Sequence, residues 1–149
     1  MRDILVTLLV FGMLPLILWR PWIGILVWSW LGYMNPHRQT WGFAYDMPFA
    51  MMVAATLFVA MLFSKEKYRL PWSGTLVIWL AFLAWMSVTT MVAIYPERAM
   101  TLYPTVMKVQ IMTLVTLMLI TDQYRIRALI WVIVGSIGFY SIKGGLFTL

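Results

Sequence analysis

Long runs of apolar residues, separated by short charged segments, constrain most strongly how this chain can fold. The cleanest run, Thr75–Tyr95, contains no charged residue. A helix that crosses a bilayer needs about 20 apolar residues and pairs all its backbone polar groups internally. The chain is 63% hydrophobic and 11% charged, whereas roughly a quarter of the residues in soluble domains are charged. The sequence therefore predicts an all-α integral membrane protein.

Charged and proline-containing breaks divide the chain into a polytopic bundle of about five or six transmembrane helices. The six predicted helices are Ile4–Trp19, Trp22–Tyr33, Pro48–Phe63, Thr75–Tyr95, Tyr103–Ile120 and Ala128–Ile142. Arg20-Pro21 interrupts the first apolar stretch, so we expect the first two helices to form a short hairpin. If that stretch is instead one kinked helix, five spans remain and the N-terminus changes side.

The helix ends are predicted from proline, glycine and charge. Pro48 and Pro104 suit the first turn of the third and fifth helices. Thr121–Arg127 is expected to be a tight polar turn, and Lys143-Gly144-Gly145 is expected to end the sixth helix. Leu146–Leu149 turns apolar again. We therefore expect residues 1–149 to be a single transmembrane region, the N-terminal part of a longer polytopic protein.

The distribution of cations predicts the orientation in the membrane. Loops on the cytoplasmic side are enriched in Lys and Arg. In the six-helix arrangement one side carries Arg20, Lys65, Lys67, Arg69, Arg125 and Arg127, and the other carries Arg2, Arg38, Arg98 and Lys143. We expect the first side to be cytoplasmic. The net charge of +6 is thus explained by topology and anion contacts, not by nucleic acid.

Composition excludes several kinds of chemistry. The chain has no cysteine, one histidine and five acidic residues, which are spread over separate loops. Thiol chemistry is therefore excluded, and no Ser-His-Asp set, carboxylate pair or metal-ligand cluster can be assembled. We expect no metal and no cofactor, and the catalytic residues stay unknown.

A few cations are candidates for binding an anionic lipid headgroup. Lys108 lies inside an apolar span, where a charge is costly unless it snorkels, pairs or faces a polar cavity. His37 and Arg38 lie in a predicted extracytoplasmic loop that continues into an aromatic run, Trp41–Tyr45. The other candidates on the same predicted side are Arg98 and Lys143. For each of them, interfacial anchoring or solvation is the simpler alternative.

The loop and helix motifs resemble a known family. They are Met1–Val6, Arg20-Pro21, Tyr33–Arg38 with Thr40–Asp46, Val106–Met112 and Gly138–Thr148. In these segments the chain resembles the N-terminal region of bacterial O-antigen ligase-like proteins, specifically the O-glycosylation ligases associated with exosortase A systems. The resemblance covers nearly the whole chain.

The resemblance implies a function and a location. Such a protein lies in the bacterial inner membrane and transfers a glycan from an undecaprenyl-pyrophosphate carrier to an acceptor on the periplasmic face. The sugar and the acceptor are not implied. The family's catalytic residues are expected beyond Leu149, so we expect the 149 residues alone to be inactive. The alternative is a non-enzymatic membrane protein, either a transporter subunit or an assembly partner, in which Lys108 marks a permeation path.

Overall fold

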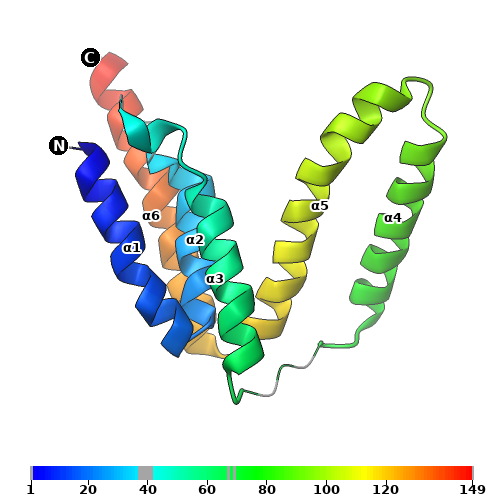
Figure 1. Cartoon of the computed structure of the whole chain (residues 1–149), viewed down its shortest axis with the longest axis horizontal. Helices are drawn as coiled ribbons and strands as arrows, with labels where there is room; N and C mark the ends of the chain where they lie inside the picture. Colours follow the sequence, from blue (N-terminus) through cyan, green and yellow to red (C-terminus); the bar gives the residue numbers. More distant parts are fainter. Residues whose placement is uncertain (1, 37–41, 67, 69, 149) are drawn as a thin grey trace. The chain divides into compact units, whose positions relative to one another are not determined.

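The computed structural model describes residues 2–36, 42–66, 68 and 70–148, and all the regular structure in these ranges is helical. The helices are α1 (Arg2–Trp19), α2 (Trp22–Met34), the short 3-10 helix η2 (Phe43–Tyr45), α3 (Phe49–Phe63), α4 (Gly74–Met91), α5 (Pro96–Leu119) and α6 (Gln123–Thr148) (Figure 1). The prediction of an all-α chain is confirmed, and of the five or six helices expected, six α-helices are present in the described residues.

The helices form two units. The discontinuous unit comprises Met1–Lys67 together with Leu119–Leu149, and the hairpin unit comprises Tyr68–Met118. The discontinuous unit thus holds α1, α2, η2, α3 and α6, whereas the hairpin unit holds α4 and nearly all of α5. The hairpin unit is an insertion in the sequence of the discontinuous unit.

In the discontinuous unit α2 lies at the centre. It packs most extensively against α6 and also contacts α3 and α1, while α1 packs on α3. The buried residues of α3 recur at helical spacing, at Phe49, Val53, Leu57 and Ala60. Ile25 and Leu31 of α2 are buried as well. One face of each helix therefore builds an apolar core.

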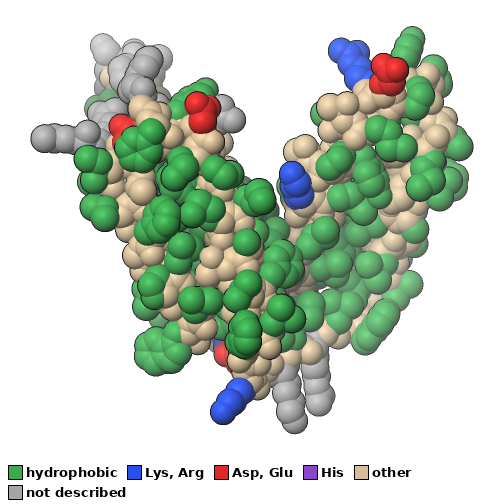
Figure 2. All heavy atoms as spheres, viewed as in Figure 1, with side chains coloured by type: hydrophobic (Ala, Val, Ile, Leu, Met, Phe, Trp, Pro, Cys, Tyr) green, Lys and Arg blue, Asp and Glu red, His purple; other side chains and the backbone are tan. Residues whose placement is uncertain are grey.

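The outward faces of the same helices are also apolar. Leu5 and Leu8 of α1 and Leu62 of α3 are exposed. Figure 2 shows hydrophobic side chains over most of the visible surface, with the charged side chains mostly near helix ends. Helices that are apolar on every side occur in the interior of large proteins or in membranes. This surface is suited to lipid.

Helix length separates the six helices into two groups. Gly74–Met91, Pro96–Leu119 and Gln123–Leu146 are each long and apolar enough to cross a membrane. Asp3–Trp19, Trp22–Met34 and Phe49–Phe63 are apolar but shorter. At about 1.5 Å per residue, the 13 residues of α2 reach about 20 Å, less than the roughly 30 Å of a bilayer core.

The predicted boundaries hold for the first three helices and need correction in α4 and α5. The fourth helix was expected over Thr75–Tyr95, but α4 ends at Met91. The fifth helix was expected to begin at Tyr103, next to Pro104, but α5 begins at Pro96 and Pro104 lies inside it. Pro96 is suited to the first position because the first N–H groups of a helix have no intrahelical acceptor. Pro104 leaves the carbonyl of Met100 without its backbone donor, yet the helix continues on both sides.

The sixth helix is longer than expected at both ends. It was expected over Ala128–Ile142, but α6 begins at Gln123, where the Ile126 N–H donates to the Asp122 carbonyl at 2.9 Å. Most of the expected turn Thr121–Arg127 is thus the first turn of a helix. Gly144 and Gly145 do not end the helix, because glycine lowers helix stability by only about 1 kcal/mol and packing can offset that cost.

Candidate functional site

Polar groups gather at one end of the discontinuous unit, which we call the Asn35 end. It contains the start of α1, the end of α2, the Gly42–Asp46 segment and the last turns of α6. The backbone N–H of Gly42 donates to Oδ1 of Asp3 at 3.1 Å. The Tyr140 hydroxyl donates to the carbonyl of Met34. Side chains of α1 and α6 thus hold both the loop and the end of α2.

Local backbone geometry explains how the chain turns here. Asn35 adopts a left-handed conformation with φ 48°, and its N–H donates to the Leu31 carbonyl at 3.1 Å. Asn tolerates this conformation better than most residues do. The Ala44 side chain of η2, which packs near α1, is fully buried. A Cβ at Gly42 would lie 2.8 Å from Oδ1 of Asp3, so glycine permits this close approach.

Lys143 is the one predicted site residue that the structure places at the Asn35 end. It lies on α6 one turn beyond Tyr140, and its side chain is exposed. Asp3 and Asp46 supply negative charge at the same end, and Asp46 is exposed too. His37 and Arg38, which the sequence also assigned to this region, lie outside the described residues.

Arg98 and Lys108 belong to the hairpin unit. Both lie on α5 with exposed side chains, about 15 Å apart along the helix axis. The Thr101 hydroxyl, between them on α5, donates to the Glu97 carbonyl at 2.8 Å. The structure places these two cations on one helix. Their proximity to Lys143 stays a prediction.

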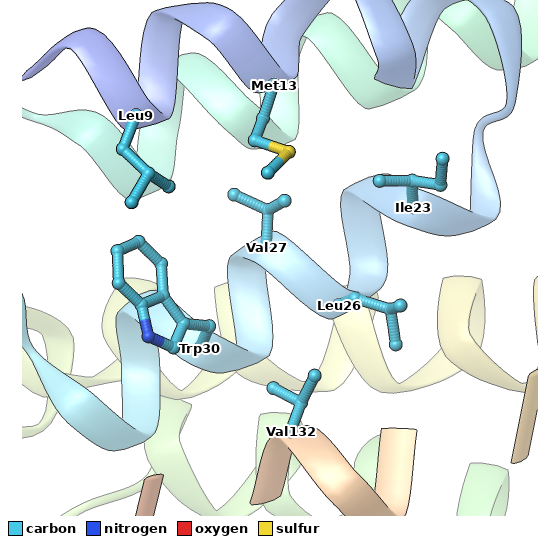
Figure 3. Close-up of a pocket in the computed structure, with 7 residues that line it drawn as sticks. All are labelled: Leu9, Met13, Ile23, Leu26, Val27, Trp30 and Val132. Atoms are coloured by element: carbon cyan, nitrogen blue, oxygen red, sulfur yellow. The ribbon is translucent and has the colours of Figure 1, made fainter. Parts of the chain in front are cut away.

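An open apolar pocket of about 370 Å³ lies within the discontinuous unit (Figure 3). Leu9 and Met13 of α1 point towards α2, which contributes four residues, and Val132 comes from α6. The α2 residues are Ile23, Leu26, Val27 and Trp30. The Trp30 indole N–H donates to the sulfur of Met34 at 2.9 Å, so this donor is satisfied within α2. The pocket is suited to an apolar group.

Helix geometry relates the pocket to Lys143. Lys143 follows Val132 by eleven residues on α6, which corresponds to about 16 Å along the axis and about 20° around it. The two residues therefore lie on the same face of α6. The separation is about half the thickness of a bilayer core.

The sequence missed Asp3 and Tyr140 as parts of this end. Both contacts join residues far apart in the chain, and a polar side chain near a helix end has many possible partners. The i, i+3 spacing of Tyr140 and Lys143 on one helix was the available signal. Among the described residues, no group of three or more His, Asp or Glu side chains is placed to hold a metal ion.

Comparison with known proteins identifies the family of the chain. No curated protein and no solved structure matches it. The model of one family, described as a family of unknown function (DUF5935), matches residues 1–149. Because the match covers the whole sequence, the chain belongs to the DUF5935 family.

Proposed function

We propose that this chain is the N-terminal membrane region of an O-antigen ligase-like protein of the bacterial inner membrane. In this proposal the Asn35 end faces the periplasm and holds the pyrophosphate of an undecaprenyl-linked glycan donor. The region binds and positions the donor from which the glycan passes to a protein or glycan acceptor.

The observation that carries the proposal is the alignment of Lys143 with the apolar pocket on one face of α6. A lipid-linked pyrophosphate combines a strongly anionic head with a long hydrocarbon chain. Lys143 is an exposed cation that would meet the anionic head. The apolar pocket lies deeper by about the thickness of one leaflet and would hold part of the hydrocarbon chain. An ordinary anchoring lysine has no need of such a pocket.

The contacts of the Asn35 end support a preformed site. Tyr140, one turn before Lys143, is held against the end of α2, and Asp3 is held against Gly42. Each contact restricts a segment next to the proposed headgroup position. A preformed site loses less conformational entropy when its ligand binds.

Other cations enter the proposal from the sequence alone. Arg38, Arg98 and His37 are expected on the same side of the membrane, where they would add contacts to the pyrophosphate. Lys108, deeper in α5, would lie below the headgroup level. These roles are supported by the resemblance to ligases. The positions of these four residues in the structure do not contribute to the argument.

The test is to measure, by native mass spectrometry, the equilibrium binding of undecaprenyl pyrophosphate to the purified protein. A charge-assisted hydrogen bond contributes about 1.5–3 kcal/mol, so Lys143→Gln should weaken binding about tenfold or more. Val132→Trp, which fills the pocket, should also weaken binding. Arg127→Gln, a cation near the other end of α6, is the matched control.

Two results would contradict the proposal. If Lys143→Gln and Arg127→Gln bind the lipid equally well, Lys143 is an anchor and not a ligand. If Lys143→Gln weakens binding but Val132→Trp does not, the hydrocarbon chain lies elsewhere and the pocket has no part in the function.

A further inference from the structure

Arg125, near the start of α6 and far from the proposed donor site, is bonded to several groups at once. Its Nη2 lies 3.1 Å from Oε1 of Glu66, and its Nη1 lies 3.3 Å from Oε2 of the same carboxylate. Nη1 also donates to the Leu119 carbonyl at 2.9 Å, and Nε lies 3.4 Å from Oδ2 of Asp122. The side chain is only 18% exposed.

Aromatic rings complete this cluster. The guanidinium carbon of Arg125 lies 5.7 Å from the centre of the Trp22 ring, within the range of a cation–π interaction. The Tyr124 ring meets Trp22 edge-on at 5.9 Å. Arginine suits this position because its planar fork binds a carboxylate with two parallel bonds while its face stacks on an aromatic ring.

The partners of Arg125 come from three separate connections. Trp22 begins α2 directly after the Arg20-Pro21 break and Glu66 follows α3. Leu119 is the last residue of α5, and Asp122 directly precedes α6. All of them belong to the discontinuous unit. One side chain therefore joins the three connections that the sequence assigned to the cytoplasmic side.

Two of these partners have a special position in the chain. Glu66 lies just before the hairpin unit, and Leu119 is the first residue after it. Glu66 and Leu119 therefore mark the two ends of the inserted hairpin, which we call its roots. Bringing the ends of so long a segment together has an entropic cost, and contacts at the roots offset it.

We infer that Arg125 is a staple that closes the roots of the α4–α5 hairpin and fixes the start of α6 against the start of α2. With the roots tied, the four-helix packing of the discontinuous unit does not depend on the conformation of the hairpin. The hairpin can then change its contacts without opening the discontinuous unit. This inference is independent of the proposed donor site.

Hydrogen–deuterium exchange of the full chain in lipid nanodiscs tests the staple. Arg125→Gln should raise the exchange rate about tenfold in the first turns of α6 and α2, because it removes the fork and leaves the Glu66 carboxylate unpaired. Exchange within α4 should stay the same. Arg125→Lys keeps the charge without the fork and should give an intermediate increase. Arg127→Lys is the matched control and should change nothing.

A double-mutant cycle isolates the Arg125–Glu66 interaction even if one substitution also disturbs other contacts. Glu66→Gln combined with Arg125→Gln should raise exchange no further than Arg125→Gln alone, since both remove the same interaction. Additive effects, unchanged exchange in Arg125→Gln, or an equal increase in α4 would each overturn the inference.

Discussion

Single residues set how closely the helices of the discontinuous unit approach one another. Gly24 of α2 is buried, and a Cβ built there would lie 3.0 Å from Cδ1 of Leu57 and 3.1 Å from Cγ2 of Ile17. These neighbours belong to α3 and α1. Small residues at such positions are typical of helix contacts in membranes, where close packing replaces the hydrophobic effect. Gly24 therefore lets α1 and α3 approach α2.

We expect Gly24→Leu to destabilise the protein by about 1–3 kcal/mol or more, the usual cost of an overpacked interior. Gly32 provides a control on the same helix, because a Cβ there meets nothing within 4 Å. Gly32→Leu should leave stability unchanged or slightly raise it, since leucine favours helix. Thermal unfolding in detergent compares the two variants, and equal midpoints would show that Gly24 is not a packing contact.

At the scale of helices, apolar runs and proline breaks predicted six elements, and all six are present. The first three agree closely with the prediction because Arg20-Pro21 and the polar segment before Pro48 interrupt backbone pairing strongly. The predicted end of α4, start of α5 and extent of α6 were wrong. An interior proline such as Pro104 costs a helix about 3 kcal/mol and a glycine such as Gly144 about 1 kcal/mol, and local sequence does not reveal whether other contacts offset these costs.

The two helices of the hairpin unit are joined by a polar contact that apolar patterns cannot predict. Oγ of Ser87 lies 2.8 Å from the Tyr103 hydroxyl. Ser87 also lies 2.9 Å from the Leu83 carbonyl and donates to it. A serine hydroxyl has one proton, so Tyr103 donates to Ser87. This bond links α4 to α5 in mostly apolar surroundings.

Tyr103→Phe should weaken the hairpin unit by about 0.5–1.5 kcal/mol, the range of interhelical hydrogen bonds in membranes. Ser87 keeps its bond to Leu83, so no donor is left unpaired and the loss stays small. Tyr95→Phe is a matched control at an exposed position just before α5. Unfolding free energies measured by steric trapping in bicelles should separate the two. A Tyr103→Phe variant as stable as Tyr95→Phe would contradict the proposed role of this bond.

For the whole molecule, charge indicated where a site could lie but not how it is built. Lys143 was selected as a candidate because a cation on the side with fewer positive residues calls for an explanation. The Asp3–Gly42 and Tyr140–Met34 bonds were missed, since both depend on α1 and α6 meeting α2. The Arg125 cluster was assigned to topology alone because its charge, and not its partners, is visible in the sequence.

The sidedness of the membrane helices is the largest remaining prediction, and the chain is well suited to testing it because it has no native cysteine. Gln123→Cys and Tyr95→Cys place thiols at exposed, uncharged positions beyond the two ends of α5. If α5 crosses the membrane with Thr121–Arg127 in the cytoplasm, an impermeant maleimide should label Tyr95→Cys in intact spheroplasts. It should label Gln123→Cys only after lysis.

Phe82→Cys, inside α4 and facing outward, should stay unlabelled in both conditions because lipid shields it. Labelling of Gln123→Cys in intact spheroplasts would reverse the orientation and place the Asn35 end in the cytoplasm. That outcome would also remove the proposed donor site from the periplasmic face.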